Sequence, residues 1–225
     1  MGNREPWYHL AAWTVRPPVS LWFNWRFEGM EHIPAEGPVL VACNHISYFD
    51  PLAHGLMMAK AGRRPRFLAK RELYGNWLLR RVLTGANQIP VERGSGSVAP
   101  VREALEALKH GEAVMVYPEG TTTRNPDFSP MQGRTGIARL TLASEVPVLP
   151  IAVWGSQRVW QREGLGSLKF GRPIWLKSGA PIDFSEFEGE QENPEILRKI
   201  TDVVIDELAR LVIDLRARYP KHWSA

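Results

Sequence analysis

The stretch NHISYFDP, residues 44–51, places a histidine five positions before an aspartate. On one continuous α-helix, five positions correspond to about 500° of rotation, so the two side chains would diverge. They can meet if a loop carries His45 and a helix begins with Asp50 as N-cap and Pro51 in the first turn. A carboxylate against one imidazole nitrogen orients the ring and leaves the other nitrogen as a general base. The spacing therefore predicts such a pair, or alternatively a helix cap beside an ordinary loop histidine.

The His45 loop follows an apolar run at residues 39–43 that is typical of a buried strand. A second polar segment, YPEGTTTR at residues 117–124, follows a similar run at residues 113–117. The glycine of that segment lets a ligand approach the backbone, and its hydroxyls and arginine can donate to an anion. The alternative is a polar turn with a helix cap. The third segment, IPVERG, places Arg93 just after another expected strand, where ligands bind in open α/β sheets.

Strand patterns alternate with helix patterns along the chain, which predicts the α/β class with a mixed, largely parallel sheet flanked by helices. We expect one α/β domain over residues 27–225 and an N-terminal amphipathic helical segment over residues 1–26. The expected strands are residues 39–43, 66–69, 88–91, 113–117, 148–154, 168–170 and 174–176. The expected helices follow Pro51 and cover residues 77–83, 101–108, 137–142 and 196–215, the last capped by Asn193 and Pro194.

Charge and aromatic residues are unevenly distributed. The net charge is only +4, yet five of the cations lie within residues 63–71, which suits a phosphate-bearing partner or else a solvated basic face. Four of the nine tryptophans lie within residues 1–25, a composition typical of a membrane interface or of a helix packed on its own core. Pro17-Pro18 should divide this segment into two short helices.

The bulk composition limits the location of the protein. A single cysteine excludes an internal disulfide bond, and no apolar run approaches the roughly 18 residues of a spanning helix. The N-terminus lacks the apolar core of a signal peptide. We therefore expect a cytosolic protein, or a peripheral one on the cytoplasmic face of a membrane.

Four blocks together resemble the glycerolipid acyltransferases, with bacterial 1-acylglycerol-3-phosphate (lysophosphatidate) acyltransferases as the most similar branch. The blocks are NHISYFD, IPVER, YPEGT and VPVLP; they span residues 44–150 in the family's order, and the general layout fits residues 27–183. The resemblance implies transfer of a fatty acyl group from acyl-CoA or acyl-ACP to the hydroxyl of lysophosphatidate, in phospholipid synthesis. It implies that His45 is the general base and that Asp50 orients it. It implies no cofactor, no metal and no nucleic acid; the partners are the lipid acceptor, the acyl donor and the membrane surface.

The same resemblance places further residues around the acceptor's phosphate. These are Arg93 and the block Glu119, Gly120 and Thr121. Since Glu119 is itself anionic, we expect it to hold a basic side chain or the loop rather than to contact phosphate. By its charge and position, Lys70 is a further phosphate ligand.

The chain departs from the family pattern at two places. The family usually has arginine directly after Glu-Gly-Thr, whereas Thr122 and Thr123 here precede Arg124. Either Arg124 reaches the same place through a longer loop, or Arg134 substitutes for it. The second block usually has glycine two positions before its isoleucine, where this chain has Asn87. Both departures concern the acceptor's head group, so glycerol 3-phosphate, another lysolipid and an amino-acid lipid stay open as acceptors.

Three other readings compete with acyl transfer to a lipid. Cys43 lies two positions before His45 and shares a strand face with it, as a covalent thioesterase would require. Asp50 and His54 are spaced by one helical turn and could bind a metal together with His45. A non-catalytic basic module that binds lipid or nucleic acid would explain the tryptophans and the cations, but not the placement of the histidine and the aspartate.

Overall fold

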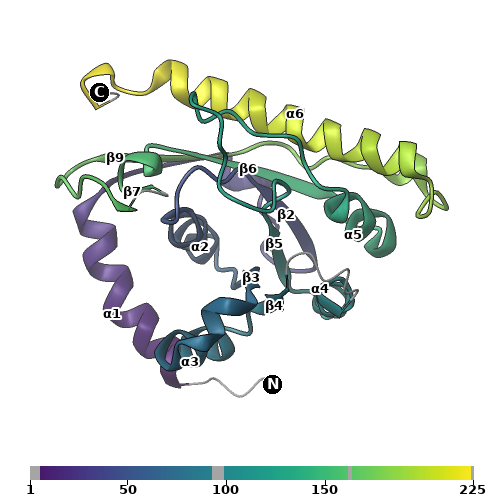
Figure 1. The fold of residues 1–225 in the computed structure, drawn as a ribbon, viewed down its shortest axis with the longest axis horizontal. Coiled ribbons are helices and arrows are strands. Elements are labelled where there is room, and N and C mark those ends of the chain that lie inside the picture. Colours follow the sequence, from purple (N-terminus) through teal and green to yellow (C-terminus); the bar gives the residue numbers. More distant parts are fainter. Residues whose placement is uncertain (1–5, 93–98, 162–163, 224–225) are drawn as a thin grey trace.

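The computed structural model describes residues 6–92, 99–161 and 164–223, with backbone only for residues 6–12 and 15. Its central feature is a seven-stranded sheet with the order β1-β9-β6-β2-β5-β3-β4 (Figure 1). The sheet strands are β1 Asn24–Glu28, β2 Val39–Cys43, β3 Pro65–Lys70, β4 Ile89–Val91, β5 Ala113–Val116, β6 Val148–Trp154 and β9 Pro173–Ser178. A separate two-stranded hairpin joins β7 Trp160–Gln161 to β8 Gly164–Leu165.

Most neighbours in the large sheet are parallel. The run from β4 through β3, β5 and β2 to β6 is parallel throughout, β9 pairs with β6 antiparallel, and β1 pairs with β9 parallel. The strands β2, β5 and β6 are buried along their whole length, as strands covered on both faces must be. The prediction of a mixed, largely parallel sheet flanked by helices is confirmed.

Helices cover the two faces of the sheet. The helices are α1 Pro6–Trp22, α2 Asp50–Lys60, α3 Trp77–Gly85, α4 Ala99–Lys109, α5 Gly136–Ser144 and α6 Pro194–Arg218. Alternate residues of β2 point to opposite sides, so Val41 and Cys43 pack with α2 in one buried cluster, while Leu40 and Ala42 pack with α4, α5 and α6 in another. Figure 1 shows α2 and α6 on opposite faces of the sheet.

Short 3₁₀ helices complete the described elements. They are η1 Met30–His32, η2 Arg71–Gly75, η3 Ser156–Arg158, η4 Ser185–Phe187 and η5 Lys221–Trp223. Because β2, β3, β4, β5 and β6 run in the same direction, their carboxyl ends lie at one edge of the sheet, and this edge carries the loops that follow them.

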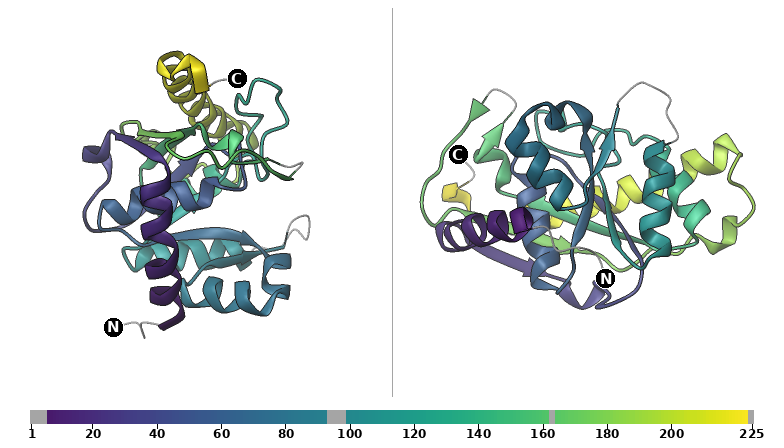
Figure 2. Two further views of the ribbon diagram at one scale, coloured as in Figure 1. Left: turned by 90° about the vertical axis from the view of Figure 1, so that its left-hand side faces the viewer. Right: turned by 90° about the horizontal axis from the view of Figure 1, so that it is seen from below.

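The N-terminal region differs from its prediction. One helix, α1, continues through Pro17 and Pro18, so these prolines do not divide the segment. Strand β1 begins at Asn24 and pairs with β9 as an edge strand, so the sheet starts two residues before the end of the expected N-terminal segment. Far from α6, helix α1 packs against α3 (Figures 1 and 2). Among the described residues, no helix is both long and apolar enough to span a bilayer.

Residues 168–170 do not form the expected strand. The backbone there is bonded to the end of α1: Trp22 Nε1 donates to the carbonyl of Leu168 at 2.7 Å, and the Gly171 N–H donates to the carbonyl of Trp22 at 2.8 Å. The segment therefore contacts the end of α1 instead of pairing with a strand. Only the later half of the expected pair is a strand, β9.

Candidate active site

His45 and Asp50 meet at the carboxyl edge of the sheet. The loop after β2 turns back so that His45 Nδ1 lies 2.9 Å from Asp50 Oδ2. Asp50 is completely buried and the His45 side chain is 11% exposed, so the pair is almost sealed from solvent on the aspartate side. Within the described part of the chain nothing bonds His45 Nε2, which leaves this nitrogen for a substrate. The predicted contact is therefore present, and the ring is oriented as a general base requires.

Asp50 holds the loop rather than capping the helix. Its Oδ2 accepts the N–H groups of Ile46 at 2.7 Å and Ser47 at 2.8 Å, and its Oδ1 accepts the hydroxyl of Ser156 at 2.6 Å. Helix α2 starts at Asp50 and its preceding residue, Phe49, makes no side-chain cap. The prediction of Asp50 as N-cap is wrong, because its carboxylate points back at the loop that carries His45.

Sequence reasoning missed Ser156, which follows β6 and is 106 residues from Asp50. A signal existed, because β6 is parallel to β2 and must end at the same edge of the sheet. It also missed Tyr117, whose ring stacks on the His45 ring with centroids 4.2 Å apart.

The block YPEGT, which follows the neighbouring strand β5, supports the His45 loop. Glu119 is buried, and its carboxylate accepts the N–H groups of His45 at 3.3 Å and Met131 at 2.9 Å. Burial outweighs these two hydrogen bonds and raises the pKa of Glu119 to about 7. The Thr123 N–H donates to the carbonyl of His45 at 2.7 Å. We expected Glu119 to hold either a basic side chain or the loop. In the structure its carboxylate holds the backbone of the His45 loop and of Met131.

Arg134, not Arg124, lies against the glycine of this block. Gly120 has a φ of +71°, and the Nε of Arg134 is 2.9 Å from the position that a Cβ on Gly120 would take. The Arg134 N–H also donates to the carbonyl of Pro118 at 2.8 Å. Arg124 is exposed farther along the loop, and Thr121 is partly buried. Of the two arginines that could replace the displaced family arginine, Arg134 has the better placement.

The structure gives less information on the other expected phosphate ligands, Arg93 and Lys70. Arg93 lies outside the described residues. Lys70 is exposed at the carboxyl end of β3, where its Nζ lies 3.8 Å from Glu72 Oε1. Asn87, at the position of the family's glycine, has a φ of +53°, a conformation that asparagine adopts more readily than most residues.

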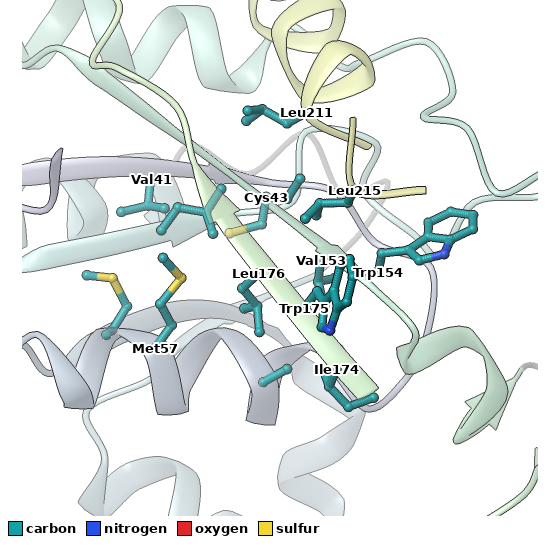
Figure 3. Close-up of a cluster of buried hydrophobic side chains, with 14 of the residues drawn as sticks. Val41, Cys43, Met57, Val153, Trp154, Ile174, Trp175, Leu176, Leu211 and Leu215 are labelled. Atoms are coloured by element: carbon teal, nitrogen blue, oxygen red, sulfur yellow. The ribbon is translucent and has the colours of Figure 1, made fainter. Parts of the chain in front are cut away.

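Cys43 does not have the environment of a nucleophile. Its side chain is fully buried among apolar residues of the cluster between the sheet and its covering helices (Figure 3). Burial raises the pKa of its thiol well above the usual value, which disfavours the reactive thiolate. The structure thus disfavours the thioesterase alternative.

The metal alternative lacks support among the described residues. No group of three or more His, Cys, Asp or Glu side chains there could hold an ion. His54 is fully buried, with Nδ1 3.0 Å from the carbonyl of Asp50 and 3.2 Å from the Tyr117 hydroxyl, and burial lowers its pKa to about 4.

Comparisons with known proteins identify the family of this chain and several relatives. Residues 24–154 match the family model described as Acyltransferase. The 1-acyl-sn-glycerol-3-phosphate acyltransferase of Bacillus subtilis is 25% identical over 169 residues, which are 74% of this chain and 82% of that protein. The lyso-ornithine lipid O-acyltransferase of Pseudomonas aeruginosa is 30% identical over 147 residues, which are 63% of this chain and 51% of that protein.

A solved structure shares the fold over nearly the whole chain. The crystal structure of the 1-acyl-sn-glycerophosphate (LPA) acyltransferase from Thermotoga maritima matches with a TM-score of 0.71 and 28% identity, covering 98% of this chain and 86% of that one. The family model covers more than half of the sequence, including the His45 and Asp50 loop and the Glu119 block. The chain therefore belongs to the acyltransferase family.

Proposed function

We propose that this acyltransferase moves a fatty acyl group from acyl-CoA or acyl-ACP to the hydroxyl of lysophosphatidate, forming phosphatidate. The observation that carries the proposal is the 2.9 Å contact between His45 Nδ1 and Asp50 Oδ2, at the edge of the sheet where the loops converge. The names of the Bacillus and Thermotoga relatives support the acceptor.

The chemistry needs one base and no covalent enzyme intermediate. His45 Nε2 takes the proton of the acceptor hydroxyl as its oxygen attacks the thioester carbonyl. The new C–O bond forms, the C–S bond breaks, and the imidazolium returns the proton to the leaving thiolate. Asp50 keeps Nδ1 protonated and facing the carboxylate, so that the lone pair lies on Nε2. Neither a metal nor a cofactor enters this scheme.

The acceptor's phosphate is assigned to cations at the same edge. Arg134 lies over Gly120, and an arginine can bind a phosphate through two parallel hydrogen bonds. Lys70 at the end of β3 adds a second positive charge. Arg93 and Thr121 complete the proposed set by the family resemblance alone.

We further propose that the enzyme is a peripheral protein on the cytoplasmic face of a membrane, held through α1 and α3. Trp13 of α1 is 80% exposed and Trp77 of α3 is 66% exposed, and these two helices pack together. Arg80 is exposed on the same helix as Trp77. Exposed tryptophan beside cations suits an anionic bilayer surface. Replacing both tryptophans by serine should weaken co-sedimentation with anionic vesicles, and unchanged binding would refute this assignment.

One test addresses the acceptor and the chemistry together. Free thiol release from palmitoyl-CoA, oleoyl-CoA and the matching acyl-ACP is followed with lysophosphatidate, glycerol 3-phosphate, lyso-ornithine lipid or no acceptor. The proposal predicts release that depends on lysophosphatidate and yields phosphatidate. Acceptor-independent release would instead indicate a thioesterase.

Lyso-ornithine lipid is included because a specific observation favours it as the second candidate. The Pseudomonas relative named for that acceptor is 30% identical to this chain. Two threonines also displace the arginine that usually follows Glu-Gly-Thr. Faster thiol release with lyso-ornithine lipid than with lysophosphatidate would identify lyso-ornithine lipid as the acceptor.

A further inference from the structure

The buried carboxylate of Asp50 is surrounded by hydrogen-bond donors. Three of them, His45 Nδ1 and the N–H groups of Ile46 and Ser47, lie against Oδ2. The other oxygen, Oδ1, receives the Ser156 hydroxyl at 2.6 Å. Both Asp50 and Ser156 are completely buried. Among the described residues, the Ser156 hydroxyl is the one hydrogen-bond donor to the carboxylate that comes from outside the His45 loop.

The backbone holds Ser156 firmly in place. Gly155 turns the chain at the end of β6 with a φ of +99°, and a Cβ there would collide with the carbonyl oxygen of Pro173. The Gly155 N–H donates to Gln157 Oε1 at 2.8 Å, and the Val159 N–H donates to the carbonyl of Ser156 at 2.8 Å. The hydroxyl is therefore presented from a rigid turn and not from a flexible loop.

The same segment holds the His45 loop at two other points. The Val153 N–H donates to Asn44 Oδ1 at 2.8 Å, one residue before His45. Farther along, the Ser47 hydroxyl and the Tyr48 N–H both donate to the carbonyl of Trp160. The segment from β6 to β7 is thus a support for the loop, and Ser156 is its contact with the carboxylate.

We propose that Ser156 is a positioning residue for acyl transfer, whose hydroxyl fixes the rotation of the Asp50 carboxylate so that Oδ2 faces His45 Nδ1. The inference rests on the proposed function, in which His45 is the base. Without the hydroxyl, Oδ1 loses its partner and only donors of the His45 loop hold the carboxylate, so it can rotate about its Cβ–Cγ bond together with that loop. A charge-assisted hydrogen bond is short and strong, so its loss affects orientation more than a neutral contact would.

Ser156 does not have the placement of a nucleophile. In a serine hydrolase the hydroxyl bonds the imidazole, which removes its proton. Here the hydroxyl bonds the carboxylate, on the far side of the pair from His45 Nε2. The base is thereby left for the acceptor's hydroxyl.

The test compares Ser156→Ala, Ser156→Thr and the wild type in the thiol-release assay, with kcat and KM measured separately. Ser178→Ala is the matched control, because Ser178 is also buried and donates one hydrogen bond, to the carbonyl of Gly179, and because it lies in β9, which β6 separates from β2 and the His45 loop. We expect Ser156→Ala to lower kcat about 10-fold to 100-fold, with KM within about twofold, the range of one hydrogen bond to a charged group. Ser156→Thr, which keeps the hydroxyl, should restore most of kcat, and Ser178→Ala should retain it.

The outcomes separate this inference from the proposed function. If the wild type acylates another lysolipid and not lysophosphatidate, the proposed acceptor is wrong, and the variants are measured on the lipid that reacts. The inference is overturned if Ser156→Ala keeps the wild-type kcat, or if the alanine and threonine variants lose kcat equally. Should the alanine variant not fold, Ser156→Cys keeps the side-chain volume with a weaker donor, and a wild-type kcat for it would overturn the inference equally.

Discussion

Replacing Asp50 by alanine or by asparagine should separate its two roles, in folding and in catalysis. Alanine removes the acceptor of four donors, from His45, Ile46, Ser47 and Ser156. Each buried donor left without a partner costs about 1 kcal/mol or more. Three of these donors are fixed by the backbone or by the Ser156 turn, so we expect Asp50→Ala to lower the free energy of unfolding by roughly 3–5 kcal/mol.

Asparagine preserves the shape of Asp50 and one acceptor oxygen. That oxygen can still accept the N–H groups of Ile46 and Ser47, and the Ser156 hydroxyl can rotate to accept from the amide. The loss of stability should therefore be roughly half of that for alanine or less. Its effect on catalysis should be large, because a neutral amide neither stabilises the His45 imidazolium nor selects the tautomer with a free Nε2. We expect kcat to fall about 10²-fold to 10⁴-fold, the usual contribution of a positioned base.

Urea unfolding gives the stabilities, and thiol release with a saturating acceptor gives kcat for both variants. The reasoning requires Asp50→Asn to be nearly as stable as the wild type and almost inactive. Wild-type kcat in a folded Asp50→Asn would show that the carboxylate's charge has no part in the reaction. Equal stability of the alanine and asparagine variants would show that the four hydrogen bonds do not hold the loop.

Three further predictions follow from the site. Arg134→Ala should raise KM for lysophosphatidate about 10-fold to 100-fold with kcat less affected, whereas Arg124→Ala, the matched control, should change KM less than about threefold. Burial raises the pKa of Glu119 from 4.5 to about 7, so between these pH values the folded protein binds a proton that the unfolded chain has released. Stability should consequently fall as pH rises through this window, and urea unfolding at about pH 5 and pH 8 should show a smaller fall for Glu119→Gln. Cys43→Ala should keep kcat while losing about 1–2 kcal/mol of stability, because it leaves a small cavity in the apolar core.

Each of these has an outcome that contradicts it. Equal KM changes for Arg134→Ala and Arg124→Ala would remove the phosphate assignment. The same pH dependence in Glu119→Gln and the wild type would show that Glu119 is ionised across the window. Loss of turnover in a folded Cys43→Ala would show that the Cys43 thiol takes part in the reaction.

Much of the site could be predicted from the sequence because three loops follow short apolar strands. Strands β2 and β6 have their predicted bounds and β5 ends one residue earlier than predicted, and parallel pairing brings their carboxyl ends together. The meeting of His45 with Asp50 is one of the two outcomes that the local spacing allowed, and the family resemblance favoured it. These features depend on neighbours in the chain, which is why residue patterns reveal them.

The features that the sequence did not reveal depend on distant partners. Strand β1, with the sequence NWRFE, has no apolar run, and it is a strand because it pairs with β9 far along the chain. The contact of Ser156 with Asp50 joins residues 106 positions apart. Arg134 reaches Gly120 because the intervening loop folds back onto Glu119. Pro17 and Pro18 lie inside one helix, where local propensity alone predicts a break.

The central claim, that His45 is the base of an acyl transfer, is tested most directly by thiol release with the wild type and His45→Ala. Both proteins receive an acyl-CoA or acyl-ACP with and without lysophosphatidate, and circular dichroism checks that the variant folds. We expect acceptor-dependent release and phosphatidate from the wild type, and a rate at least about 10²-fold lower from His45→Ala. Release at the wild-type rate by a folded His45→Ala would contradict the claim.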